Sequence, residues 1–203
     1  MAAAKVQSIT CQKGCAKCCI LYVFATLQEA ECIAHYLYRH EAVLQHFIAA
    51  YRDWRRGLGV FGNKLPRLER LIARNLYGEL SAQEQERLDN DISDYAGLNI
   101  TCPFLLDNAC SIYEVRPFVC AGVVAVTPVE KCLWGISGVN KGEYHRLGFD
   151  LDKDMPYFIR PRNSVLFGCL PELVHSLLEQ GYSFLAGIEG LEEFRHSIPR
   201  RSS

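Results

Sequence analysis

Apolar side chains in the first half of the chain recur every three or four positions, which is the period of an amphipathic helix. Leu27, Ala30, Ala34 and Leu37 form the first such row. The same spacing continues well beyond it and is interrupted by the stretch LGVFGN. The pattern predicts four helices, over about 26–39, 41–57, 65–77 and 81–95.

Residues typical of helix ends support these boundaries. The stretches TLQE at 26–29 and SAQE at 81–84 have the form of capping boxes, in which two side chains satisfy free backbone amides of the first turn. Pro66 suits a first turn because its missing N–H has no helical partner there. We expect Gly57 and Gly97 to end the second and fourth helices.

The helical period fades over 99–167, where Pro and Gly are scattered. VVAVT at 123–127 predicts a short strand, and the rest of this region predicts loops and turns. Pro171 suits the first turn of a last helix that ends near Gly181, and a short helical turn is expected near 190–196.

This pattern predicts a mainly α fold with at most a short strand pair. A chain of 203 residues fits a single domain, so we treat 1–203 as one unit. So long an irregular stretch is unusual in a compact domain unless something fastens it. The unit has a helical part at about 26–97, a Cys-rich loop part at about 99–167 and a C-terminal helix at about 170–181.

Composition narrows the classes of function. The 22 Lys and Arg residues nearly balance the 23 Asp and Glu residues, so no overall positive field favours nucleic acid. No run of about 18 apolar residues occurs, so we expect no membrane insertion. The opening MAAAKVQSIT lacks the apolar segment of a secretory signal, so we expect a cytoplasmic protein with reduced thiols. A protein partner and the oligomeric state stay open.

Charge is uneven along the chain although it nearly cancels. Residues 52–74 are rich in Arg and Lys, whereas 79–94 are rich in Asp and Glu. A basic face that binds a partner would explain the first stretch. We favour the simpler interpretation, in which two solvated helix faces pair with each other.

The stretch CQKGCAKCC places four of the ten cysteines within 11–19. A disulfide framework is disfavoured, because a reducing compartment is expected and the neighbours Cys18 and Cys19 do not readily bridge each other. We assign Cys32 and Cys169 to the core, because each lies alone in the sequence and free cysteine is commonly buried. Crowded thiols instead indicate a metal centre, which would also fasten the irregular region. Eight candidate ligands, or two sets of four, are Cys11, Cys15, Cys18, Cys19, Cys102, Cys110, Cys120 and Cys132.

CQKGCAKCC, followed far downstream by CPFLLDNACSIYEVRPFVC at 102–120, resembles the zinc- or iron-chelating cysteine-cluster family, the CxxCxxCC or YkgJ-like domain. The first gap here has three residues where the family name has two, and Ala121 replaces the Arg that often follows the last Cys. The resemblance implies a metal-binding domain of uncharacterised function. Flagellin lysine N-methylases resemble the family distantly in their cysteine segments.

The metal is open between zinc and iron. Both Zn²⁺ and a [4Fe–4S] cluster take thiolate ligands at such spacings, and Pro103 after Cys102 resembles the Cys-Pro of ferredoxins. We lean slightly to iron–sulfur. The spacing at 11–18 also resembles radical S-adenosylmethionine enzymes, but those need a parallel α/β barrel, which a helical chain lacks.

Arg116 beside Tyr113 is a candidate for holding an anionic ligand or cofactor near the centre. We favour instead a structural role, in which Arg116 pairs with a carboxylate and caps its turn. The histidines show no metal-binding spacing, and no motif of a hydrolase, NTPase or dinucleotide-binding enzyme occurs.

Three functions follow. The first is a metal-binding protein that holds iron–sulfur or zinc for structure or electron transfer. The second is a small protein-modifying or methyl-transferring enzyme with an open site on the cluster. The third is a zinc-stabilised module for metal handling or partner docking. The sequence does not determine whether there is catalysis.

Overall fold

The computed structural model describes residues 9–76, 78–126, 128, 144–146 and 167–180, and this part of the chain is mainly helical. The predicted fold class is therefore confirmed. The helices are α1 (Leu27–Arg39), α2 (Glu41–Leu58), α3 (Leu65–Leu76), α4 (Ala82–Gly97), α5 (Phe118–Ala121) and α7 (Leu170–Gln180), with 3₁₀ turns at Gly59–Lys64 and Tyr113–Val115.

The strands are short and form three antiparallel pairs in the described residues, where the sequence predicted at most one. β1 pairs with β6, β2 with β3, and β4 with β5. The predicted strand in VVAVT is present as β4. The strands are β1 (Phe24–Thr26), β2 (Leu105–Leu106), β3 (Ala109–Cys110), β4 (Val123–Ala125), β5 (Tyr144–Arg146) and β6 (Phe167–Cys169).

Both predicted capping boxes are present, at the starts of α1 and α4. The end of α2 differs from the prediction, because the helix continues through Gly57 to Leu58. Gly59 closes it with a positive φ of 49°, a conformation that glycine adopts without steric cost. α4 likewise includes Gly97 as its last residue. The helical turn expected near 190–196 lies outside the described residues.

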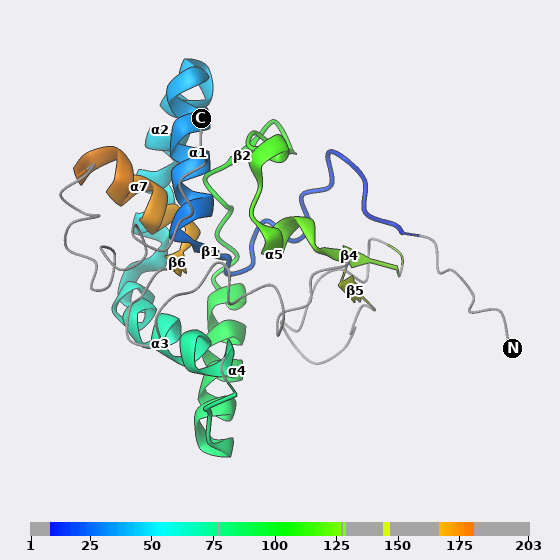
Figure 1. The fold of residues 1–203 in the computed structure, drawn as a ribbon, viewed down its shortest axis with the longest axis vertical. Coiled ribbons are helices and arrows are strands. Elements are labelled where there is room, and N and C mark those ends of the chain that lie inside the picture. Colours follow the sequence, from blue (N-terminus) through cyan, green and yellow to red (C-terminus); the bar gives the residue numbers. More distant parts are fainter. Residues whose placement is uncertain (1–8, 77, 127, 129–143, 147–166, 181–203) are drawn as a thin grey trace, which may run out of the picture.

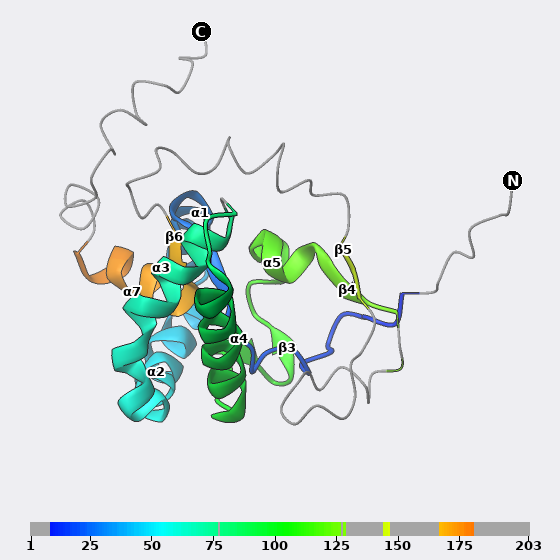
Figure 2. The same ribbon diagram turned by 90° about the horizontal axis from the view of Figure 1, so that it is seen from below.

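The helices share one hydrophobic core. α2 contributes Phe47 and Trp54, which are among the largest fully buried side chains, and α3 and α7 add Leu68 and Val174. Trp54 Nε1 donates a hydrogen bond of 3.0 Å to the Tyr95 hydroxyl on α4, so the buried indole N–H is satisfied. Figures 1 and 2 show these helices gathered on one side, with α5, β4 and β5 on the other.

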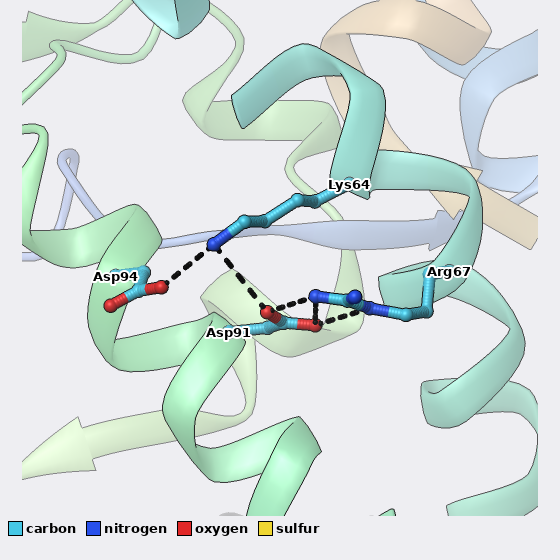
Figure 3. A network of polar contacts seen from close by, with 4 residues as sticks. All are labelled: Lys64, Arg67, Asp91 and Asp94. Carbon is cyan, nitrogen blue, oxygen red and sulfur yellow. Dashed lines mark hydrogen bonds and ion pairs between the residues drawn. The ribbon is translucent and has the colours of Figure 1, made fainter. Parts of the chain in front are cut away.

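The basic and acidic stretches pair with each other, as predicted. Arg67 donates to both carboxylate oxygens of Asp91 at 2.6–3.0 Å, and Asp91 is buried (Figure 3). Lys64 Nζ lies 2.9 Å from Asp94 Oδ2. Arg74 pairs with Glu84 farther along the same two helices. The opposite charges therefore join α3 to α4.

Candidate metal centre

The two cysteine segments lie against each other. The Cys102 backbone N–H donates to the Cys19 carbonyl at 2.6 Å, which ties the start of the second segment to the end of the first. The first segment is a series of turns, in which the Cys19 N–H donates to the Ala16 carbonyl at 3.0 Å. Gly14 takes a positive φ of 91°, a conformation that glycine adopts without steric cost where this loop bends.

A hairpin brings Cys102 and Cys110 toward each other. β2 and β3 are joined by Asp107 and Asn108, whose positive φ values of 49° and 60° are those of a tight hairpin turn. The Ser111 N–H donates to the Phe104 carbonyl at 2.8 Å and extends the pairing beyond the strands. The two thiols thus lie at the open end of one small hairpin.

The hairpin is anchored on α2. The Phe104 ring stacks on Phe47 with centroids 4.5 Å apart and an angle of 9° between the ring planes. The His46 Nε2 lies 2.9 Å from the Leu105 carbonyl, so the hydrogen bond requires the tautomer that is protonated at Nε2. Phe104 is 1% exposed, so the hairpin belongs to the main core. The core thereby fixes the position of the second cysteine segment.

Glu29 joins α1 to the helix that carries Cys120. One carboxylate oxygen accepts hydrogen bonds from the Thr26 N–H at 2.7 Å and from its hydroxyl at 2.8 Å, within the capping box. The other oxygen accepts from the Phe118 N–H at 2.7 Å, at the start of α5. One oxygen therefore caps α1 and the other fixes the start of α5, which carries Cys120, relative to the helical core.

Thiols of the two cysteine segments influence one another electrostatically. Burial raises the pKa of Cys102 to about 12, and charge on Cys110 and Cys18 adds to that rise. Burial also raises the pKa of Cys120, and charge on Cys102, Cys18 and Cys110 raises it further. Burial likewise raises the pKa of Cys110. Because these thiols raise one another's pKa, they lie within electrostatic reach of one another, and a bound cation would stabilise their thiolate forms.

The titrations of the vicinal thiols depend on each other. Contact with the Cys19 side chain lowers the pKa of Cys18, although burial opposes this. The same contact, together with burial, raises the pKa of Cys19. The ionisation of one of these neighbouring thiols therefore opposes that of the other.

Arg116 lies over the Tyr113 ring, with Cζ 4.2 Å from the centroid. Lys13, from the first segment, places Nζ 5.6 Å from the same centroid. Among the described residues, no carboxylate forms an ion pair with Arg116, so the expected carboxylate partner is not found there. Its positive charge instead acts on Cys18, Cys110 and Cys120.

The remaining cysteines lie apart from this group or outside the described residues. The Cys11 sulfur accepts a hydrogen bond of 3.1 Å from the Ala125 N–H on β4, and Cys15 is half-buried in the same loop. Cys132 is not among the described residues. Cys169 is buried, as predicted, but Cys32 is exposed on the outer face of α1 and is not a core residue.

The thiols converge without forming a closed coordination shell. Within the described ranges, no three Cys, His, Asp or Glu side chains stand at positions that could hold a metal ion. The convergent group consists of Cys18, Cys19, Cys102, Cys110 and Cys120, with Arg116 at its edge.

Sequence reasoning missed two residues that shape this site. Glu29 was recognised as a helix cap, but nothing in its spacing indicated its second bond to Phe118. His46 has no metal-binding spacing, and its bond to the hairpin carbonyl joins positions 59 residues apart. Its place next to Phe47 in the predicted helix over 41–57 was the one signal in the sequence.

Comparison with known proteins bears on the chemistry. The model of the CxxCxxCC family, described as "Putative zinc- or iron-chelating domain", matches residues 10–136. No curated protein and no solved structure matches the chain. In the described part of the chain, no helix is both long and apolar enough to cross a membrane.

Proposed function

The chain belongs to the CxxCxxCC family of zinc- or iron-chelating domains, and we propose that it binds one metal centre through Cys18, Cys102, Cys110 and Cys120. The observation that carries this proposal is the contact between the two cysteine segments, in which the Cys102 N–H donates to the Cys19 carbonyl at 2.6 Å and the β2–β3 hairpin brings Cys110 toward Cys102. Cys19 lies beside Cys18 and is available as a replacement ligand.

The chemistry of the donor set fits the family's metals. Thiolates are the ligands that Zn²⁺ and iron–sulfur clusters share, and both take four of them. The four thiols do not stand at coordinating positions, so binding requires their side chains and the first loop to draw together. Cys11 and Cys15 lie in the same loop and are further candidate ligands.

Between a zinc ion and an iron–sulfur cluster, we favour a cluster of the [4Fe–4S] type. Pro103 directly follows Cys102 and is fully buried, as in the Cys-Pro turns of ferredoxins. When bound, such a cluster supplies electron transfer. Cys18, Cys102, Cys110 and Cys120 would hold it, and Phe104 and Ile112 are buried side chains of the segment that carries three of these cysteines.

The decisive measurement is metal and inorganic sulfide analysis of the full chain, purified without oxygen and without chelators, together with a visible spectrum. Iron with matching sulfide and a broad band near 400 nm would support the cluster. Colourless protein with stoichiometric zinc would replace it by a zinc site. Protein that contains neither metal and takes up neither Zn²⁺ nor Fe²⁺ would refute the proposal.

A further inference from the structure

The start of the first cysteine segment is tied to β4 by three hydrogen bonds. The Thr10 backbone N–H donates to the Ala125 carbonyl at 2.9 Å, and the Thr10 hydroxyl donates to the same oxygen at 3.1 Å. The Ala125 N–H donates in turn to the Cys11 sulfur at 3.1 Å. We call this set of bonds the Thr10 clamp. Figure 2 shows the first segment running beside β4.

The clamp uses the edge of β4 that β5 leaves open. A residue in a strand directs its N–H and its carbonyl to the same edge, and both of these groups of Ala125 bond to the first segment. The Ala125 side chain is 1% exposed, so this point of the strand is buried. A carbonyl oxygen has two lone pairs and can accept both donors of Thr10. The backbone bond is open to most residues, whereas the second bond needs a hydroxyl.

The clamp fixes one end of a loop whose other end is already fixed. The Cys102 N–H donates to the Cys19 carbonyl at 2.6 Å, which holds the far end of the first segment against the hairpin. β4 begins two residues after the end of α5, which carries Cys120, so the clamp joins the near end to that part of the chain. Cys18, a proposed ligand, lies between the two attachments.

Two attachments restrict the loop more than one does. A segment that is held at a single end explores many conformations, and metal binding must then supply the entropy cost of ordering it. A segment that is already held in place binds with less of this cost. The clamp lies outside the residues of the helical core, so this effect is separable from the stability of the helices.

We propose that Thr10 is a positioning residue of the metal centre, which clamps the first cysteine segment to β4 and thereby holds it beside the second segment before the metal binds. The proposal deepens the metal-binding function and rests on it. Thr10 is not a ligand in this proposal, because its hydroxyl donates to a backbone carbonyl.

The test measures the affinity of the metal-free full chain for Zn²⁺ by competition with a chromophoric chelator under reducing conditions. Thr10→Val keeps the branched shape and the backbone bond but lacks the hydroxyl, and it should weaken Zn²⁺ binding by about threefold to tenfold. Thr10→Ser retains the hydroxyl and should recover most of that loss. Thr10→Pro lacks both donors and should bind more weakly than Thr10→Val. Ser93→Ala, which removes an exposed hydroxyl from α4, is the control and should bind as the wild type does.

Two further measurements separate positioning from general stability. Hydrogen exchange of the metal-free chain should increase at the amides of 10–15 in Thr10→Val, because one attachment of the loop is weakened. Urea denaturation of the same variant should give the wild-type free energy of unfolding, since the helical core is unchanged. The thiolate-to-Co²⁺ absorption should keep its intensity, because the same thiols still bind the metal.

Three results would overturn the proposal. The first is wild-type affinity for Zn²⁺ in Thr10→Val, and the second is a Thr10→Ser variant that binds as weakly as Thr10→Val. The third is weak binding that accompanies a general loss of stability of the helices, since Thr10 would then act on the fold as a whole.

The two proposals fail in different ways. A wild-type chain that binds neither zinc nor iron removes the proposed function. A wild-type chain that binds metal, with a Thr10 series that matches it throughout, removes only the role of the Thr10 clamp.

Discussion

At the scale of single residues, the structure separates cysteines that the sequence alone treats alike. Cys102, Cys110 and Cys120 lie among other thiols, whereas Cys169 is 1% exposed and its N–H donates to Glu69 at 2.8 Å. A thiol among thiols is suited to metal binding, and a solitary buried thiol behaves as a small apolar side chain. These cysteines differ in the side chains that surround them and in their exposure to solvent. The spacing of cysteines in the sequence reveals neither property.

Cys110→Ser should therefore lose the metal, because a serine hydroxyl is a poor replacement for a thiolate in such a centre. Cys169→Ser should keep full metal content while losing some stability, because it places a hydroxyl in the core. Metal content per chain, measured by elemental analysis after identical purification, checks both. Equal metal content in the two variants would contradict the ligand assignment.

The sequence could predict part of this site. Four cysteines in nine residues indicate metal without any knowledge of the fold, since reduced thiols are rarely so crowded otherwise. The helical period also contains the evidence that Cys32 is exposed, because Cys32 lies on the helix face opposite the apolar row that includes Ala30 and Ala34. The sequence could not predict what Arg116 contacts, because a long side chain has many reachable partners.

At the scale of elements, the carboxylate of Glu29 connects α1, a helix of the core, to α5, the helix that carries Cys120. Glu29 caps α1, which belongs to the core, and also accepts a hydrogen bond from the first residue of α5, which carries Cys120. α5 has only four residues and cannot be stable alone, since helix nucleation is unfavourable. Its position therefore depends on contacts such as this one.

Glu29→Ala should lower the free energy of unfolding by about 1–3 kcal/mol, because it removes a cap and leaves backbone amides unpaired. It should also weaken Zn²⁺ binding, since Cys120 is held less firmly. Urea denaturation and chelator competition measure the two effects. Glu41→Ala, in the exposed first turn of α2, is the control for loss of a carboxylate. Metal affinity of Glu29→Ala equal to that of Glu41→Ala would show that α5 is positioned without Glu29.

The capping box of α4 makes a second prediction, about pH. Hydrogen bonds from the Ser81 backbone and side chain, and the ion pair with Arg74, lower the pKa of Glu84 from the usual 4.5 to about 2. A lowered pKa in the folded state means that the charged carboxylate stabilises the fold above pH 4.5 and that this contribution is lost as pH falls toward 2. The contribution of Glu84 to the free energy of unfolding should therefore decrease as the pH is lowered through this range.

The stability difference between wild type and Glu84→Gln should consequently shrink as pH falls from about 5 to about 2.5. Urea denaturation at several pH values measures it, with Glu86→Gln on the exposed face of the same helix as the control. A difference that does not change across this range would contradict the assignment of Glu84 as a charged cap.

The elements themselves were largely predictable. The two capping boxes and the apolar rows located α1, α3 and α4 closely, because in each case local chemistry and burial agree. The end of α2 was placed at Gly57, whereas the helix closes at Gly59, because a glycine ends a helix only where the chain must take a positive φ. The pairings β1–β6 and β4–β5 were not predictable, since each joins distant segments through backbone bonds that carry no sequence signature.

At the scale of the whole molecule, two parts depend on different forces. The helical part buries Phe47, Trp54, Leu68 and Val174 in one apolar core. The cysteine segments contain strands of two or three residues and a helix of four, so their own backbone hydrogen bonds order them only weakly. Phe104 is the exception, because it inserts the hairpin into the core.

Removal of the metal should therefore loosen one part and spare the other. We expect hydrogen exchange to increase at the backbone amides of 11–22 and 118–125 after treatment with a strong chelator under reducing conditions, because these segments lose the centre that fastens them. Amides of α2 and α4 should keep their protection, since their core contains no metal ligand. Amides of the hairpin around Phe104 should lose an intermediate amount of protection, because the hairpin contacts the core on one side and carries the cysteines on the other.

Hydrogen exchange followed by mass spectrometry resolves these segments in one experiment, and readdition of Zn²⁺ should restore protection. Uniform loss of protection across all helices would mean that the metal stabilises the entire fold. The apolar core would then be insufficient on its own, and the division of the molecule into a self-sufficient helical part and a metal-dependent part would be wrong.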